Sequence, residues 1–286
     1  MQQAIQTIRR ELNGLYTSSE ISVLTRLILE EVCSTSFAGI ATDKINHLSG
    51  FQTRKMEDIL SRLKRGEPHQ YVMGKTSFYG MEFRVTADVL IPRPETEELV
   101  EWILSENTSE NPVMLDMGTG SGCIAVALAK NIPSANVRAW DISENALQIA
   151  AENAEKNEVT VHFSRQDILQ PLTPGMTYDI VVSNPPYVME SEAEDMERNV
   201  LDFEPHEALF VPDVNPLLFY ERIADAALTI LNDGGRLYFE INRSKGPEIV
   251  EMLEDRGFVE IELRKDISGN NRMIRAVKPR VHGEDQ

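Results

Sequence analysis

The spacing of apolar side chains divides the chain into a helical first part and a second part in which strands and helices alternate. Apolar residues recur at helical spacing in three runs, at residues 5–15, 21–28 and 51–63. Ser18 and Ser19 precede the second run as candidate N-caps, and Gly66 and Pro68 end the third. The pattern predicts a small helical bundle over residues 1 to about 70.

The chain changes character after residue 71. Residues 78–85 alternate in polarity as in two strands around a turn, which predicts a β-hairpin. Pro92 and Pro94 then interrupt the chain. A new helix is expected at residues 95–104, with acidic residues in its first turn, where they favour the helix dipole.

From about residue 111 short apolar runs alternate with helical ones. Strands are expected at 113–116, 137–141, 159–163, 180–183, 236–241, 258–263 and 272–277. Helices are expected at 124–130, 145–157, 217–231 and 247–253. This rhythm predicts an α/β fold with a mostly parallel sheet and helices on both faces.

Composition and charge narrow the classes of function. The chain has 286 residues and a formal net charge of -18, which argues against an enzyme that grips naked nucleic acid. Cys33 and Cys123 lie far apart and form no disulfide framework, which fits a reducing compartment. The five histidines show no metal-ligand spacing, so no metal is expected. With neither a signal peptide nor a membrane span in the sequence, we expect a cytoplasmic protein.

A glycine-rich loop follows the strand expected at 113–116 and precedes a helix. Glycines let the backbone approach a ligand closely, and ligands of open parallel sheets bind outside the carboxyl ends of the strands. A dinucleotide loop would need a third glycine at position 123, where Cys123 stands. The observed pattern with a leading aspartate is typical of the loop that holds S-adenosylmethionine. The loop residues are Asp116, Met117, Gly118, Thr119, Gly120, Ser121 and Gly122.

Two further strands end in candidate cofactor ligands. Asp141 closes the next strand, where a carboxylate can accept two ribose hydroxyl hydrogen bonds. Asp167 follows the third strand, where it could contact the adenine amino group, and Ile168 beside it could pack on the adenine ring. Each acidic residue alone could equally be a solvated loop carboxylate or a helix N-cap.

The segment Asn184-Pro185-Pro186-Tyr187 directly follows the fourth strand. Two prolines fix the backbone and remove two N–H donors, so the loop is rigid and rich in acceptors. The side-chain carbonyl of Asn184 and the backbone carbonyl of Pro185 could accept both hydrogens of a planar –NH2 group, and Tyr187 could stack beside it. Two acceptors set in place beforehand favour a pyramidal nitrogen, aim its lone pair at a methyl group and stabilise the developing positive charge.

At these residues the chain resembles the PrmC/HemK family, the protein-(glutamine-N5) methyltransferases of peptide chain release factors. The resemblance runs nearly from end to end. Its markers are Pro-Arg-Pro-Glu-Thr-Glu at 92–97, the glycine loop at 116–122, the tetrapeptide at 184–187, and Phe-Glu-Pro at 203–205 with Ala-Leu at 208–209. The tetrapeptide is shared with adenine-N6 and guanine-N2 methyltransferases, whereas the segment at 92–97 and the helical first part are more specific.

The resemblance implies a domain organisation and a reaction. A helical substrate-recognition domain would span 1–72, a β-hairpin linker 73–92, and a seven-stranded Rossmann-like class I methyltransferase domain 93–286. The implied cofactor is S-adenosyl-L-methionine. The implied substrates are class 1 peptide chain release factors, methylated on N5 of the glutamine in Gly-Gly-Gln by an enzyme expected to be a monomer.

The resemblance also carries roles over to residues of this chain. Residues 118–122 would bind the cofactor, Asp141 its ribose, and Asp167 and Ile168 its adenine end. Family members often carry an aromatic residue where Ile168 stands, so adenine stacking is expected to be weaker here. Residues 184–187 would hold the glutamine amide, with Asn184 also bordering the cofactor.

Two other functions and two segments stay open. One alternative enzyme is a nucleic-acid adenine-N6 or guanine-N2 methyltransferase, which the acidic charge disfavours. A non-catalytic adaptor on the same fold is disfavoured by the intact loop, Asp141 and Asn184.

Arg93 and Glu95 would line the cofactor mouth or form a structural cap. The acidic stretch 190–204 is expected to be a solvated loop or helix face rather than a lid or docking surface.

Overall fold

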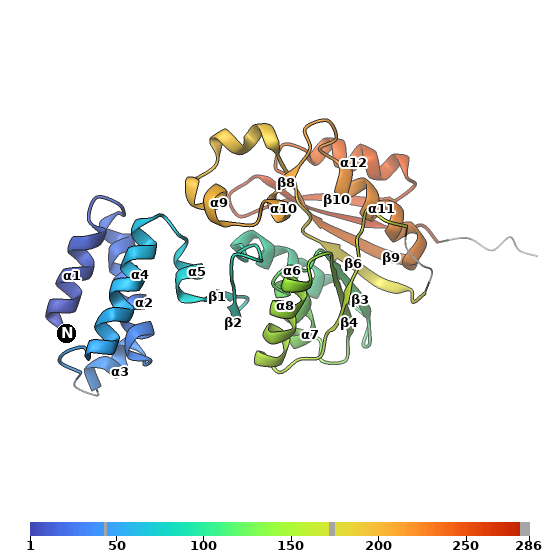
Figure 1. Cartoon of the computed structure of the whole chain (residues 1–286). Coiled ribbons are helices and arrows are strands. Elements are labelled where there is room, and N and C mark those ends of the chain that lie inside the picture. Colours follow the sequence, from blue (N-terminus) through green and yellow to red (C-terminus); the bar gives the residue numbers. More distant parts are fainter. Residues whose placement is uncertain (43–44, 172–174, 281–286) are drawn as a thin grey trace, which may run out of the picture. The chain divides into compact units, whose positions relative to one another are not determined.

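A computed structural model describes residues 1–42, 45–171 and 175–280 (Figure 1). The chain forms two compact units. The smaller unit holds Met1–Lys75 together with Glu197–Phe203. The larger unit holds Thr76–Met196 and the residues from Glu204 onward. Each unit has its own hydrophobic core.

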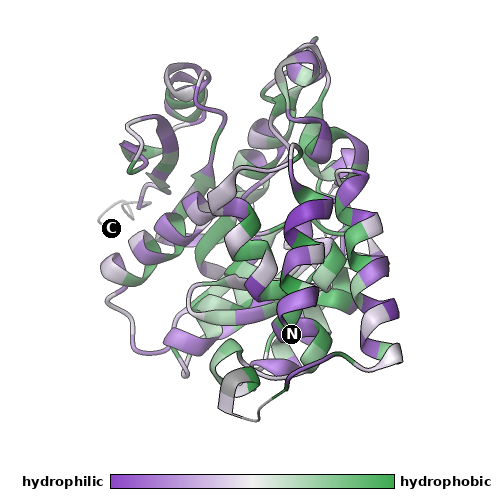
Figure 2. Ribbon diagram, turned by 90° about the vertical axis from the view of Figure 1, so that its left-hand side faces the viewer, coloured by the Kyte–Doolittle hydropathy of each residue, from purple (hydrophilic) through white to green (hydrophobic). Residues whose placement is uncertain are grey.

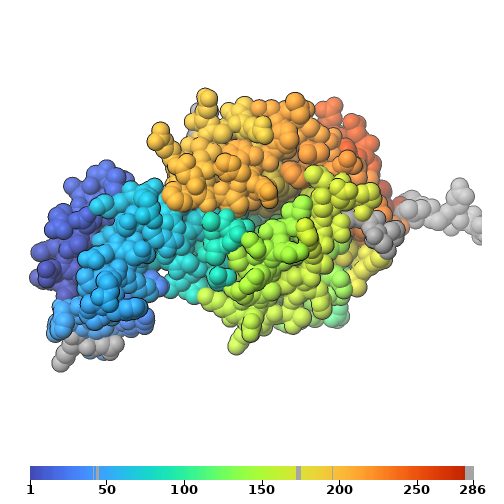
Figure 3. All heavy atoms as spheres, viewed as in Figure 1, coloured from blue at the N-terminus to red at the C-terminus, as the bar shows by residue number. Residues whose placement is uncertain are grey.

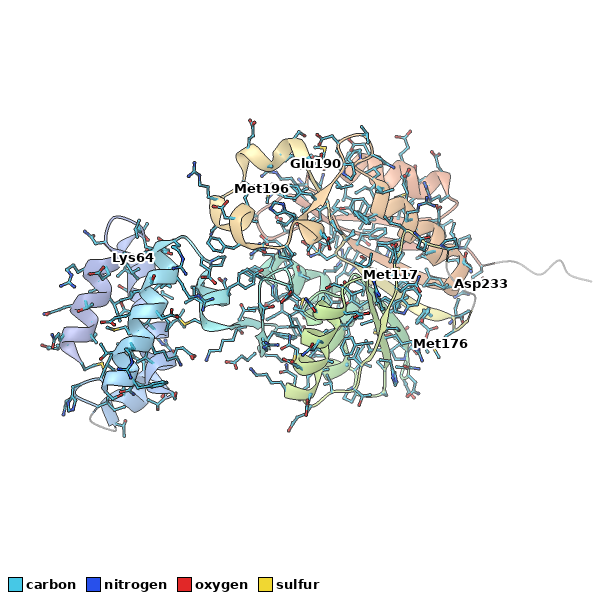
Figure 4. All side chains as sticks on the ribbon, viewed as in Figure 1. Lys64, Met117, Met176, Glu190, Met196 and Asp233 are labelled. Atoms are coloured by element: carbon cyan, nitrogen blue, oxygen red, sulfur yellow. The ribbon has the colours of Figure 1, made fainter. Side chains whose placement is uncertain are left out.

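The smaller unit is helical, as the apolar spacing predicts. Its helices are α1 (Gln2–Leu12), α2 (Ser18–Cys33), α3 (Phe37–Thr42), α4 (Gly50–Lys64), α5 (His69–Met73) and α9 (Arg198–Phe203). Apolar residues of α1, α2 and α4 form its core, including Ile8, Leu12, Ile28 and Leu63, which are almost fully buried. Figure 4 labels Lys64, the last residue of α4.

Two details of the helical prediction are wrong. The first helix ends at Leu12, so Leu15 does not continue the buried stripe and is 56% exposed. The N-cap of α2 is Thr17, one residue before the predicted Ser18 and Ser19. Thr17 and Glu20 form a reciprocal capping box, in which each side chain accepts a hydrogen bond from the backbone N–H of the other residue. The box satisfies the backbone N–H groups of both Thr17 and Glu20.

The larger unit is built on a seven-stranded sheet of order β10-β11-β9-β6-β3-β4-β5. Strands β3, β4, β5, β6 and β9 run parallel, and β11 is antiparallel to both of its neighbours. The seven strands are β3 (Val113–Met117), β4 (Asn136–Asp141), β5 (His162–Arg165), β6 (Tyr178–Ser183), β9 (Leu231–Glu240), β10 (Val259–Lys265) and β11 (Asn271–Val277). The predicted α/β fold with a mostly parallel sheet is confirmed.

Alternate residues of the central strands face two different helical layers. Met114 and Val182 join the cluster that includes α6, α7 and α8, whereas Leu115 and Val181 join the cluster that includes α11 and α12. Both faces are therefore apolar, as a buried parallel sheet requires. The helices are α6 (Pro94–Glu106), α7 (Cys123–Asn131), α8 (Glu144–Lys156), α11 (Leu218–Ile230) and α12 (Gly246–Asp255). In Figure 2 green, hydrophobic residues alternate with purple, hydrophilic ones along the helices.

Short elements surround the sheet. They are the hairpin β1 (Lys75–Phe78) with β2 (Met81–Arg84), the strands β7 (Val188–Met189) and β8 (Phe210–Val211), the 3-10 helix η1 (Glu190–Asp195), and α10 (His206–Leu209). The strand expected at 159–163 begins only at His162, because α8 ends at Lys156 and Glu158 turns the chain with φ +58°. No helix within the described residues is long and apolar enough to cross a membrane.

Candidate functional site

The glycine loop connects β3 to the first turn of α7. Gly118, Gly120 and Gly122 all have positive φ, a region that L side chains rarely adopt. A Cβ added at Gly122 would stand 2.9 Å from the Cβ of Ala150 in α8, so only glycine fits there. The N–H groups of Gly118 and Thr119 donate to the carbonyl of Trp140 at 2.8 and 2.9 Å. The loop is thus fixed to the neighbouring strand β4.

The leading aspartate of the loop is buried beneath it. Asp116 is 1% exposed, and the Thr119 hydroxyl donates to its Oδ2 at 2.6 Å. Burial raises the pKa of Asp116 to about 7, and the nearby carboxylate of Asp141 adds to the increase, while the Thr119 hydrogen bond opposes it. Through this hydrogen bond the buried carboxyl holds the start of the loop.

Asp141 lies at the end of β4, opposite the loop. Its Oδ2 accepts a hydrogen bond from the Gly120 N–H at 2.8 Å, and its Oδ1 accepts one from the Ser143 N–H at 2.9 Å. Burial raises the pKa of Asp141, and these two backbone donors oppose the increase. Each carboxylate oxygen retains acceptor capacity, because an oxygen of an ionised carboxylate can accept about two hydrogen bonds.

A cavity of about 410 Å³ opens at the carboxyl ends of the parallel strands and lies entirely within the larger unit. Its size is that of small-molecule sites, which are commonly 300 to 1,000 Å³. Figure 3 shows the green and orange segments of this unit on opposite sides of a hollow, and Figure 4 labels Met117 at the end of the central strand β3. The predicted loop residues on its wall are Gly118, Thr119, Gly120 and Ser121.

The charges on the cavity wall suit a cationic, partly apolar ligand. Asp88, Asp141, Asp167 and Glu207 contribute carboxyl groups, against the single guanidinium of Arg93. Apolar side chains, among them Leu90, Ile142, Ile168, Phe210 and Phe219, complete the wall. S-adenosylmethionine combines a sulfonium cation and an amino-acid end with a ribose and a flat adenine. The acidic groups of the wall suit the sulfonium cation, and its apolar side chains suit the flat adenine ring.

Asp167 and Ile168 both line the cavity after β5. Asp167 Oδ1 accepts a hydrogen bond from the Leu169 N–H at 2.9 Å. Ile168 is half-buried and also packs against the hydrophobic cluster that holds α11 and α12. Both residues therefore line the same cavity as Asp141.

The tetrapeptide follows β6 and is divided between the cavity and the protein interior. Asn184 and Pro186 line the cavity, whereas Pro185 and Tyr187 do not. The segment is held at its start by Ser183, whose hydroxyl donates to the carbonyl of Met117 at 2.6 Å and so links the ends of β6 and β3. Asn184 Nδ2 points to the Thr96 hydroxyl at 3.4 Å. Among the described residues, no hydrogen bond to Asn184 Oδ1 is seen.

Tyr187 is directed into the larger unit rather than into the cavity. Its hydroxyl donates to Glu240 Oε1 at 3.2 Å, and burial beside this carboxyl raises its pKa. Asn242 Nδ2 donates to the Tyr187 carbonyl at 3.0 Å and to Glu192 Oε2 at 2.9 Å. No functional role was predicted from the sequence for Glu240 or Asn242, because neither belongs to a recognised motif. Glu240 is the last residue of β9 and Asn242 follows two residues later.

Arg93 and Glu204 form an ion pair that connects two marker segments of the sequence. The Glu204 side chain is 1% exposed, and its Oε2 also accepts a hydrogen bond from the Ile91 N–H at 3.3 Å. The expectation of a solvated face therefore fails for Glu204, because Arg93 compensates its buried charge. Arg93 itself lines the cavity, as does Pro205 next to Glu204, so the pair braces one side of the site.

Comparisons with known proteins agree across sequence and structure. The family described as "PrmC N-terminal domain" matches residues 3–74, and "Methyltransferase small domain" matches residues 96–202. Among solved structures, a methyltransferase from Pyrococcus furiosus has a TM-score of 0.52 at 16% identity, covering 71% of this chain and 91% of its own. The delta-N METTL16 MTase domain has a TM-score of 0.51 at 17% identity, covering 70% and 89%. These two likenesses establish the fold.

Curated relatives are much more similar in sequence. The release factor glutamine methyltransferase of Bacteroides thetaiotaomicron is 47% identical over 94% of this chain and 97% of its own length. That of Flavobacterium psychrophilum is 45% identical over 92% and 94%, and that of Bacillus subtilis is 41% identical over 80% and 84%. Identity at this level over nearly the whole length shows the family, and the chain belongs to the release factor glutamine methyltransferases.

Proposed function

We propose that this enzyme transfers a methyl group to N5 of the glutamine in the Gly-Gly-Gln motif of class 1 peptide chain release factors. S-adenosylmethionine, when bound, supplies an electrophilic methyl group on a sulfonium centre. The glutamine nitrogen uses its lone pair to form the new nitrogen–carbon bond, while the electrons of the sulfur–methyl bond stay with sulfur. One amide proton leaves to solvent, so the product is a neutral N-methyl amide.

The cofactor would be held by the wall that carries the glycine loop. Residues 118–121 bring backbone close to the ligand, while Gly122, which does not line the cavity, lets the loop pack against Ala150 of α8. Asp141 offers free acceptor sites to the ribose hydroxyls, and Asp167 with Ile168 borders the adenine end. The carboxyl-rich lining supports this assignment, because a cation gains from nearby negative charge. A dinucleotide is less suitable, since its pyrophosphate would meet the same carboxylates.

The single observation that carries the reaction is the orientation of Asn184. Its Nδ2 end is directed at Thr96, so its Oδ1 end remains available to accept a hydrogen bond from an –NH2 group in the cavity. The second hydrogen is assigned to the backbone carbonyl of Pro185, a buried residue that does not line the cavity, so substrate binding must bring the two groups within reach. Two fixed acceptors raise the reactivity of a nitrogen whose lone pair is otherwise delocalised, and they stabilise the charge that develops on it. Pro186 shapes the wall beside this group, and Tyr187 supports the tetrapeptide from the protein interior through its hydrogen bond to Glu240.

Protein rather than nucleic acid is the proposed substrate class. The relatives are named for release factor glutamine, and the net charge of -18 would repel a phosphate backbone. We propose that the helical unit, residues 1–72, recognises the release factor and that residues 73–92 link it to the catalytic domain, residues 93–286. We further propose that the enzyme is monomeric and acts in the cytoplasm, where Cys33 and Cys123 would stay reduced as the free thiols they are.

A labelled-methyl assay tests this function against its main alternative. The purified enzyme is incubated with methyl-labelled S-adenosylmethionine and, in separate reactions, a class 1 release factor, the same factor with the motif glutamine replaced by alanine, transfer RNA, and duplex DNA. Label is expected in the unmodified release factor and in no other substrate. Label in RNA or DNA, with none in the release factor, would make the enzyme a nucleic-acid methyltransferase.

A further inference from the structure

We propose that Thr96 and Glu240 are positioning residues that determine which end of the Asn184 side-chain amide faces the substrate. This inference rests on the proposed function and extends it to two residues outside the tetrapeptide. A primary amide has unlike ends, because its oxygen only accepts hydrogen bonds and its nitrogen only donates them. Asn184 can hold an –NH2 group only if its oxygen faces the cavity, so something must prevent the amide from turning over.

The direction of one hydrogen bond supplies that control. The Thr96 hydroxyl donates its single hydrogen to Glu240 Oε2 at 2.6 Å. An ionised carboxylate can only accept, so the hydrogen cannot point elsewhere while this bond is made. The Thr96 oxygen therefore presents only lone pairs to Asn184, and it can be approached only by the amide nitrogen. The observed Nδ2 to Oγ1 distance of 3.4 Å is long, and such contacts commonly shorten when substrate binds.

The burial of Thr96 and Glu240 favours a single orientation of the Asn184 amide. Glu240 is 1% exposed, and Thr96, although it lines the cavity, is only 2% exposed, so little of either partner is open to water. An unmade hydrogen bond at a buried polar group is costly, which favours the one arrangement that satisfies all three side chains. Turning the Asn184 amide over would place its oxygen against the Thr96 oxygen with no hydrogen between them.

Glu240 also holds the other end of the tetrapeptide. Its second oxygen, Oε1, accepts the Tyr187 hydroxyl hydrogen at 3.2 Å. The two oxygens of one carboxylate thus reach Asn184 through Thr96 and reach Tyr187 directly. Because α6, β6 and β9 bring these residues together from distant parts of the sequence, Glu240 sets the relative placement of the amide and the ring.

The negative charge of Glu240 is needed to hold the Thr96 hydroxyl in this direction. Burial raises its pKa, whereas the Thr96 hydrogen bond, the positive charge of Arg272 and the Tyr187 hydroxyl oppose that increase. The titratable and charged groups whose charges or hydrogen bonds bear on it from other elements are Glu95, Cys123, Tyr187, Tyr220 and Arg272. A protonated Glu240 could donate to the Thr96 oxygen, and the Thr96 hydrogen would then be free to point at Asn184 and reverse its preference.

Substitutions at Thr96 separate the hydroxyl from the shape of the side chain. Thr96→Val keeps the volume and removes the hydroxyl, and we expect kcat on a release factor to fall about tenfold or more, the scale of one lost hydrogen bond. Thr96→Ser retains the hydroxyl and should restore most of kcat. Thr229→Val, which removes a threonine hydroxyl bonded to the Asp225 carbonyl within α11, is the control and should leave kcat unchanged.

Glu240→Gln tests the carboxylate. We expect kcat to fall as in Thr96→Val, because the glutamine amide can donate to Thr96 and release its hydrogen toward Asn184. In the wild type, kcat should decline as pH falls through the raised pKa of Glu240, and Glu240→Gln should lose that limb of the profile. Tyr238→Phe, which removes a different hydroxyl to glutamate hydrogen bond in β9, is the control. Cofactor affinity, measured by calorimetry, should change little in each variant.

A measurement without substrate separates this inference from the proposed function. In protein labelled with nitrogen-15 on asparagine, the Asn184 –NH2 protons should show a nuclear Overhauser contact with the Thr96 methyl group above the Glu240 pKa. The contact should weaken in Glu240→Gln. Absence of the contact in the wild type, or wild-type kcat and pH profile in both Thr96→Val and Glu240→Gln, would overturn the inference. A wild-type enzyme that shows the contact but does not methylate release factors would overturn only the proposed function.

Discussion

The Gly120 backbone N–H donates to the Asp141 carboxylate at 2.8 Å, so the loop after β3 and the acidic residue at the end of β4 are joined before any ligand binds. A second donor, the Ser143 N–H, holds the other oxygen of Asp141 at 2.9 Å. Two backbone donors fix the plane of the carboxylate and leave its remaining lone pairs for the cavity. A preorganised acceptor of this kind loses little entropy on binding a ribose.

Removing this carboxylate should weaken the cofactor site in two ways. Asp141→Ala deletes the ribose acceptor and frees the Gly120 N–H, and we expect S-adenosylmethionine affinity to fall about tenfold to a hundredfold, the scale of hydrogen bonds to a charged group. Because burial raises the pKa of Asp141, wild-type affinity should also decline as pH falls through that raised pKa, and Asp141→Ala should not share this decline. Calorimetry across pH measures both. Equal affinities would remove Asp141 from the cofactor site.

Asn184→Ala should separate binding from catalysis. The variant retains the glycine loop and Asp141, so cofactor affinity should be kept, whereas turnover on a release factor should fall about a hundredfold or more, as for other preorganised polar groups. Single-turnover kinetics, with calorimetry on the same preparation, measure the two quantities. Asn184→Asp is a sharper companion, because it places a carboxylate oxygen against the Thr96 oxygen and should also lose turnover. Wild-type turnover in Asn184→Ala would exclude Asn184 from the mechanism.

Two glycines of the loop should respond differently to alanine. Gly118 has φ +75° and open space around it, so Gly118→Ala should destabilise the fold by about 1–2 kcal/mol through backbone strain alone. Gly122 has φ +81° and also lies against Ala150, so Gly122→Ala should add about 1–3 kcal/mol of overpacking to the same strain. Denaturant unfolding without cofactor compares them. Equal losses of stability would mean that the contact between the loop and α8 is looser than the structure indicates.

The buried Asp116 should make the fold less stable as pH rises toward neutrality. Its pKa is raised to about 7, whereas an unfolded aspartate titrates near 4, so the folded state holds a proton that the unfolded state has lost between these values. Stability from this residue is full below about pH 4 and is lost progressively up to about pH 7. Asp116→Asn cannot ionise and should therefore gain stability relative to wild type between pH 5 and pH 8, on the order of a few kcal/mol.

Urea unfolding at about pH 5 and about pH 8 measures the gain in stability of Asp116→Asn over wild type. Val23→Ala in α2, which changes an exposed side chain and no titratable group, is the control, and its difference from wild type should be nearly the same at both pH values. A difference between Asp116→Asn and wild type that does not change with pH would show that Asp116 titrates as an ordinary carboxyl.

Much of the fold followed from local signals in the sequence. Apolar spacing predicted the core helices and the seven sheet strands, because buried faces repeat with the period of each element. The ends of helices and strands were predicted less accurately where a single residue determines them. Thr17 rather than Ser18 caps α2, since its hydroxyl and Glu20 satisfy two amides together, and β5 begins late because Glu158 turns the chain.

The site was predictable only where a motif lies within one stretch of sequence. Asp141, Asp167 and Asn184 were predicted to face one cavity because each follows a parallel strand, and the structure places all three on its wall. Thr96 and Glu240 are 144 residues apart and meet through the order of the strands, which apolar spacing does not reveal. The burial of Glu204 was missed for the same reason, because its partner Arg93 precedes it by 111 residues.

The position of the transferred methyl group is the most direct test of the central claim. A purified class 1 release factor is treated with the enzyme and S-adenosylmethionine, digested, and sequenced by tandem mass spectrometry alongside a reaction with the Asn184→Ala variant. The peptide that contains Gly-Gly-Gln should gain the mass of one methyl group, located by fragment ions on the glutamine side chain, and the variant should give little of it. A methyl group on another residue, or an unmodified peptide after complete reaction conditions, would contradict the assignment.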